Sequence, residues 1–186
     1  MNLAILASHN GSALEAIKEA IDSNELPLNI SLIISNNSDA KVLQKAAAYN
    51  LAHAVVNKKL YDNPDDKIYS LLKEHKCELV FLAGYMKKVS PKITQNFRVI
   101  NSHPALLPKF GGAGMYGRFV HEAVIEAKEQ QSGVSIHEVN ELYDDGEVIL
   151  QKTLSLESGE TVESLEKKIK KLEKEAIVEA LKLCLK

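Results

Sequence analysis

The segment Leu3 to Ile21, LAILASHNGSALEAIKEAI, decides the fold class of this chain. It begins with an uninterrupted apolar run, Leu3 to Ala7, as in a strand that is buried on both faces of a parallel sheet. A polar turn with Gly11 follows, and helical spacing starts at Leu14. A strand, a glycine-containing turn and a helix in this order are typical of a doubly wound α/β protein. The turn also places backbone N–H groups at a helix N-terminus, which favours a bound phosphate.

The same alternation of apolar runs and helical patterns continues along the chain. Further strands are predicted at Leu32–Ile34, Leu51–Val56, Leu79–Ala83 and up to Asn101, and helices at 39–49, 67–73 and after Pro91, with a polar loop at 58–66. We therefore predict a Rossmann-like, mostly parallel twisted sheet with helices on both faces, in one domain over residues 1–186. Its halves are expected at 1–100 and 101–186. Ligands bind at the carboxyl ends of the strands in such sheets, so the turns after the strands are expected to lie along one edge.

In the second half of the chain, the pattern predicts a hairpin in place of alternating strands and helices. Ser132–Val139 and Val148–Leu156 are predicted to pair as a hairpin across a long acidic turn. Helices are expected at 120–129 and, with an apolar stripe, over 161–186.

Between the halves lies Val99 to Phe110, VINSHPALLPKF. Asn101 and His103 are two residues apart where the strand is predicted to end, so their side chains point to the same side. Pro104 then imposes an extended or turn conformation. Two convergent polar groups, one a donor and one titratable, can stabilise a developing oxyanion. From this stretch alone, a polar turn with a surface imidazole remains the alternative.

Composition excludes several classes of function. The chain has 186 residues, 26% of them charged, and a formal net charge of −2, without the basic stripe of a nucleic-acid-binding protein. No apolar run approaches the ~20 residues of a membrane span, and the N-terminus lacks a signal peptide, so we expect a cytoplasmic protein.

Cys77 and Cys184 stand alone, which predicts neither a disulfide nor a metal site. Gly11 also stands alone, without the glycine pattern of a dinucleotide site.

Five motifs, in this order, resemble the phosphoribosylglycinamide formyltransferases of purine biosynthesis. They are Asn10-Gly11-Ser12, LAGYM at 82–86, NSHPALLPKF at 101–110, GMYG at 114–117 and SGVSIHEVNELYDDGEVILQ at 132–151. The resemblance extends from Met1 to about Leu183. It implies transfer of a formyl group from the co-substrate 10-formyltetrahydrofolate to the amine of N1-(5-phospho-D-ribosyl)glycinamide, without a metal ion, on the route to IMP.

The resemblance also implies roles for individual residues. Asn101 and a protonated His103 would hold the oxyanion, while Asp144 would favour the charged imidazole and help to move protons. The first half would bind the nucleotide phosphate, and the second would carry catalysis and folate binding. The implied substrate-binding residues are Gly11, Ser12, Ala13, Lys109 and Glu173, and the implied folate-binding residues are Met86, Lys87, Lys88, Val89, Asn101, Asn140 and Asp144. His137 corresponds to a second histidine near the site.

The sequence departs from the family pattern at a few positions. Ala13 stands where the family often has Asn, Lys87 stands where Arg is frequent, and the 58–66 segment is short. These differences bear on substrate affinity more than on reaction class. Two alternative functions remain. The chain could formylate another amine, such as an amino sugar, or it could bind folate or a nucleotide without catalysis. Only small-molecule partners are expected, with no nucleic acid and no membrane, and the chain is expected to be a monomer or a homodimer.

Overall fold

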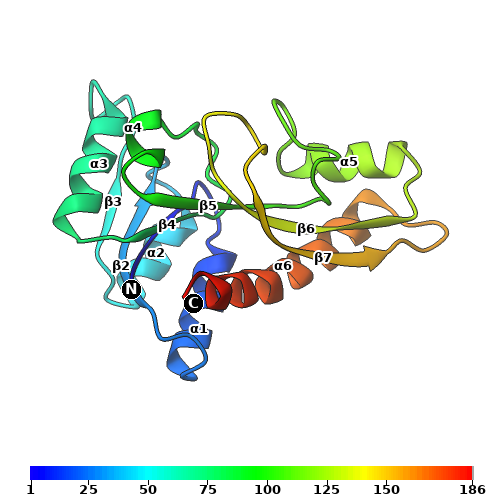
Figure 1. The fold of residues 1–186 in the computed structure, drawn as a ribbon, viewed down its shortest axis with the longest axis horizontal. Coiled ribbons are helices and arrows are strands. Elements are labelled where there is room, and N and C mark those ends of the chain that lie inside the picture. Colours follow the sequence, from blue (N-terminus) through cyan, green and yellow to red (C-terminus); the bar gives the residue numbers. More distant parts are fainter. Residues whose placement is uncertain (186) are drawn as a thin grey trace. The chain divides into compact units, whose positions relative to one another are not determined.

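The structure is a computed structural model, and it describes residues 1–185 (Figure 1). The chain forms two compact units, the first comprising Met1–Asn101 and the second beginning at Ser102. In the part of the chain that the structure describes, no helix is long and apolar enough to cross a membrane.

The first unit contains a parallel sheet with the strand order β3-β2-β1-β4-β5. Its strands are β1 (Asn2–Leu6), β2 (Asn29–Ser35), β3 (His53–Val55), β4 (Leu79–Leu82) and β5 (Arg98–His103), and its helices are α1 (Ser12–Asp22), α2 (Lys41–Ala48), α3 (Pro64–Glu74) and α4 (Pro91–Thr94). The predicted α/β class with a mostly parallel sheet is therefore confirmed.

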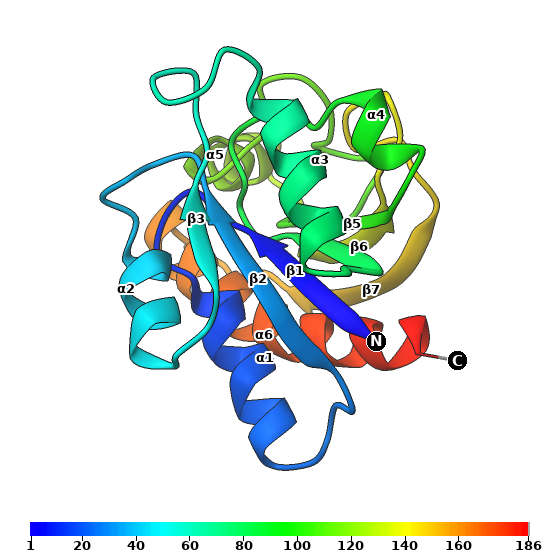
Figure 2. The ribbon, with the colours of Figure 1, turned by 90° about the vertical axis from the view of Figure 1, so that its left-hand side faces the viewer.

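Helices cover both faces of this sheet. Figure 2 shows α1 and α2 on one side of β1 and β2, and α3 on the other. The strand order runs outward from β1 to β3 and then returns to β4, and right-handed crossovers in such an order place helices on both faces of the sheet. Because both faces are covered, every residue of β4 is buried, as the apolar sequence of that strand predicts.

Two predicted boundaries are wrong. Strand β5 continues to His103, so Asn101 and His103 lie within the strand and not in the turn after it. Helix α3 begins at Pro64, inside the predicted polar loop, because the Asn63 side chain accepts a hydrogen bond from the Asp66 N–H at 3.3 Å. Asn as the N-cap and Pro as the first helical residue are a strong start signal.

The second unit contains a hairpin and two helices. Its elements are α5 (Arg118–Glu126), β6 (Gln131–Glu138), β7 (Val148–Ser155) and α6 (Val162–Cys184). Strands β6 and β7 are antiparallel, with Gln131 opposite Ser155, so the predicted hairpin is confirmed. Helix α6 starts at a capping box in which the Thr161 and Ser164 side chains bond reciprocally to the backbone, and it packs on β6 and β7. The last residue of the predicted helix lies outside the described residues.

Candidate active site

His103 is a buried imidazole at the end of β5. Its Nε2 lies 2.7 Å from the carbonyl oxygen of Phe110, and its Nδ1 lies 3.6 Å from Oδ2 of Asp144. A carbonyl oxygen can only accept, so Nε2 carries a hydrogen and the Nδ1 edge faces the carboxylate. The distance to Asp144 exceeds that of a direct hydrogen bond, so this pair interacts through its charges.

Asp144 is held in place by Gly112, by His137 and by the backbone of its own turn. The Gly112 N–H donates to its Oδ2 at 2.9 Å, and Nε2 of His137 lies 3.5 Å from its Oδ1. Asp144 itself has φ 54°, in the left-handed region, and a Cβ added at the nearby Gly146 would lie 1.8 Å from the Glu138 carbonyl oxygen. The turn between β6 and β7 is therefore tightly fixed where it presents the carboxylate.

The Asp144 carboxylate lies between two imidazoles, and His103 faces it through Nδ1 whereas His137 faces it through Nε2. Nδ1 of His137 is 2.7 Å from the carbonyl oxygen of Glu138, just as Nε2 of His103 faces that of Phe110. Each ring has an acceptor on its backbone side and the Asp144 carboxylate on the other. The arrangement leaves Nδ1 of His103 facing the carboxylate, where a proton taken up by this ring would be stabilised by Asp144.

Burial controls the charge of His103. Removal from water lowers the pKa of His103, and nearby His137 lowers it further, while Asp144 and the Phe110 carbonyl raise it without compensating. The pKa of Asp144 is raised by burial, but hydrogen bonds from His137 and Gly112 and the field of His103 bring it below its usual value. In the ligand-free chain, burial therefore opposes the expected protonation of His103, whereas Asp144 acts in the expected direction. The lowered pKa values favour a neutral imidazole at His103 beside an ionised carboxylate at Asp144.

Ser102, between Asn101 and His103, contacts a different group. Its hydroxyl donates to Oε1 of Glu173 on α6 at 2.5 Å. Burial raises the pKa of Glu173, against the smaller lowering effects of the Ser102 hydrogen bond and Lys170. Strand alternation puts Ser102 on the face opposite Asn101 and His103. Its contact with Glu173 joins residues far apart in the chain, and no sequence pattern predicts that contact.

Comparisons with known proteins show the family of this chain. The family model described as formyl transferase matches residues 1–181. The chain belongs to the formyl transferase family. A phosphoribosylglycinamide formyltransferase from Haemophilus influenzae is 35% identical over 92% of this chain and 81% of its own length. The enzyme of that name from Bacillus subtilis is 32% identical over 91% of this chain and 87% of its own length. The crystal structure of the phosphoribosylglycinamide formyltransferase from Bacillus halodurans superposes with a TM-score of 0.91 at 32% identity, covering 100% of this chain and 95% of that one.

In this formyl transferase chain, the first turn has the predicted form. Gly11 has φ 68° and caps α1, and a Cβ there would lie 2.6 Å from Cγ2 of Val42. Ser12 and Ala13 are the first two residues of the helix, where backbone N–H groups have no partner within the helix. This geometry is compatible with phosphate binding through the backbone.

The turns after three strands of the first unit are linked through Ser8. Its hydroxyl accepts a hydrogen bond from the Met86 N–H at 2.8 Å and donates to Oδ1 of Asn36 at 2.5 Å. The turns after β1, β2 and β4 therefore lie along one edge, as the sequence predicts for this sheet. Within the segment expected to bind folate, Lys87 and Lys88 are exposed, whereas the side chain of Val89 is buried.

Two further predicted residues have partners of their own in the second unit. Nζ of Lys109 pairs with Oε1 of Glu129 at 2.8 Å. The Asn140 side chain accepts from the Leu142 N–H at 2.8 Å and so shapes the turn before Asp144. No group of three or more His, Cys, Asp or Glu residues within 1–185 is placed to hold a metal ion.

Proposed function

We propose that this chain transfers the formyl group of 10-formyltetrahydrofolate to the amine of N1-(5-phospho-D-ribosyl)glycinamide. The products are the formylglycinamide ribonucleotide and tetrahydrofolate, in purine biosynthesis. Formyl transfer follows from family membership, and the relatives named phosphoribosylglycinamide formyltransferase support this acceptor. The observation that carries the chemistry is the Asp144 carboxylate between the imidazoles of His103 and His137.

The reaction requires charge stabilisation and proton transfer. When the amine attacks the formyl carbon, negative charge develops on the formyl oxygen, the amine loses a proton, and the departing folate nitrogen gains one. The Asn101 amide is suited to donate to the oxyanion, an interaction worth ~3–4 kcal/mol per donor. His103, neutral at the start, can accept the proton at Nδ1, where Asp144 stabilises the resulting imidazolium. The proton then passes to the folate nitrogen, so no net proton is consumed.

The remaining site residues have binding roles in this proposal. In the first unit, Gly11, Ser12 and Ala13 would bind the phosphate, and residues 86–89 would contact folate. In the second unit, Glu173 would contact the glycinamide, and Asn140 with Asp144 would contact folate. A phosphate role for Lys109 requires Nζ to leave Glu129. We expect the enzyme to act in the cytoplasm, as a monomer or a homodimer.

A formyl-transfer assay with the two substrates tests the proposal. His103→Ala should lower kcat by roughly 10²–10³-fold, because it removes the proton acceptor, while the affinity for glycinamide ribonucleotide changes little. His53→Ala is the matched control, since His53 is an exposed histidine on β3, and it should retain full activity. Wild type that formylates an amino sugar but not the glycinamide would refute the acceptor. Wild type that binds folate and formylates neither would refute catalysis.

A further inference from the structure

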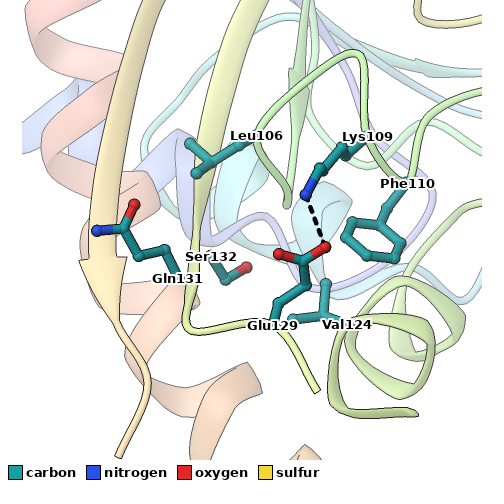
Figure 3. Close-up of a pocket in the computed structure, with 7 residues that line it drawn as sticks. All are labelled: Leu106, Lys109, Phe110, Val124, Glu129, Gln131 and Ser132. Atoms are coloured by element: carbon teal, nitrogen blue, oxygen red, sulfur yellow. Dashed lines mark hydrogen bonds and ion pairs between the residues drawn. The ribbon is translucent and has the colours of Figure 1, made fainter. Parts of the chain in front are cut away.

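A cavity of about 190 Å³ in the second unit lies beside Phe110 (Figure 3). Its lining residues come from the segment after β5, from α5 and from the start of β6: Leu106, Lys109, Phe110, Val124, Glu129, Gln131 and Ser132. A cavity of about 150 Å³ in another protein binds benzene. This one therefore has room for a single ring or a branched aliphatic chain.

The cavity contains a buried hydroxyl without a partner. Ser132 is 2% exposed, and its Oγ has no hydrogen-bond partner among the described residues. Figure 3 shows this oxygen turned toward the Glu129 carboxylate, whereas the Gln131 amide points away. A buried hydroxyl left unbonded costs about 1–3 kcal/mol, so a ligand that bonds to it gains affinity.

The same cavity has one charge of each sign. Nζ of Lys109 and Oε1 of Glu129 are 2.8 Å apart, and their side chains are 66% and 26% exposed. A ligand carrying only one charge would displace one partner and leave the other unpaired. A zwitterion can bond to both, with its ammonium between Glu129 and the Ser132 oxygen and its carboxylate on Lys109.

Apart from Gln131, whose amide points away from the cavity (Figure 3), the rest of the lining is apolar and consists of Leu106, Phe110 and Val124. An aliphatic or aromatic side chain would bury its surface against these residues, while the zwitterionic end reaches the three polar groups. We propose that this cavity binds a free apolar α-amino acid and that its occupancy is sensed by His103 through Phe110.

Phe110 connects the cavity to the catalytic imidazole. Its ring lines the cavity, and its carbonyl oxygen is 2.7 Å from Nε2 of His103. It also has φ 56°, a conformation that non-glycine residues rarely adopt and that persists only where the surroundings impose it. A ligand packed against the ring changes those surroundings, and the hydrogen bond to His103 must respond. The regulatory meaning of this link rests on the proposed function of His103, but binding to the cavity does not.

Titration calorimetry with L-leucine and L-phenylalanine tests the site without an activity assay. We expect at least one of them to bind, and 3-methylbutylamine and 4-methylpentanoate, which each lack one charge of leucine, to bind at least about tenfold more weakly. Glu129→Gln and Ser132→Ala should each weaken binding severalfold or more. Glu179→Gln, which removes a carboxylate paired with Lys152 elsewhere on the second unit, should leave binding unchanged.

The link to His103 is tested by the imidazole NMR signals of the same protein. Saturation with the bound amino acid should shift the His103 signals in wild type and leave the exposed His53 signals in place. Absence of binding by both amino acids, or binding of 4-methylpentanoate as tight as that of leucine, would overturn the zwitterion site. Binding without a shift at His103 would overturn the link. A failed formyl-transfer assay alone would refute only the proposed function.

Discussion

The charge of His103 is decided by competition between burial and its neighbours. Burial lowers the pKa, and Asp144 and the Phe110 carbonyl raise it only in part. A neutral imidazole that gains a proton during the reaction is a better base than one already charged. In the proposed reaction, the low pKa of His103 and the adjacent Asp144 carboxylate would therefore serve the same step, since the carboxylate stabilises the imidazolium only when it forms.

An NMR titration of His103 should accordingly give a pKa below 6.5, the usual value for histidine. Asp144→Asn removes the neighbour that raises this pKa, so the midpoint should fall further in that variant. Exposed His53 is the internal reference in the same spectra. A midpoint for His103 at or above 6.5 in wild type would contradict the dominance of burial.

At this scale the sequence predicted the proximity of His103 and Asp144 but not the burial of the imidazole. The spacing of Asn101 and His103 placed them on one face, and the pairing of His103 with Asp144 followed from the resemblance. The burial that lowers the pKa of His103 depends on the packing around β5, and no local sequence pattern predicts that packing. Ser102 was missed for the same reason, because its partner Glu173 lies on α6.

At the scale of elements, the turn between β1 and α1 requires glycine at position 11. Gly11 adopts a left-handed conformation, and the space of a Cβ is already occupied by Val42 on α2. Apolar runs and helical periodicity predicted these elements well. The early start of α3 depends on the Asn63 cap, and β5 continues two residues past Asn101, where its pairing with β4 ends.

Gly11→Ala should therefore destabilise the protein by about 2–4 kcal/mol, from the left-handed backbone together with overpacking against Val42. Gly159→Ala is the matched control, because Gly159 also has a positive φ but would meet nothing within 4 Å. It should cost only about 1 kcal/mol. Urea unfolding of the two variants measures the difference, and equal losses would show that the contact with Val42 is unimportant.

At the scale of the whole molecule, two buried histidines link folding to pH. His121 on α5 is buried with its Nδ1 lacking a hydrogen-bond partner among the described residues, and burial lowers its pKa, as it does for His103. A histidine whose pKa is lower in the folded chain binds its proton more readily in the unfolded chain. Stability is therefore lost as the pH falls from about 6.5 through the folded pKa, by up to about 1.4 kcal/mol per pH unit for each group.

His121→Leu isolates one of these contributions, since leucine fills a similar volume and does not titrate. Glu173 acts in the opposite direction, because its raised pKa favours the folded chain as the pH falls, but it is the same in both proteins and cancels in the difference. The unfolding midpoint should drop between pH 7 and pH 5 in wild type, and the variant should gain stability relative to wild type over that interval. Thermal unfolding at several pH values measures both curves. If the two midpoints stay at a constant separation from pH 7 to pH 5, His121 takes up its proton equally in the folded and unfolded chains, and burial does not govern its charge.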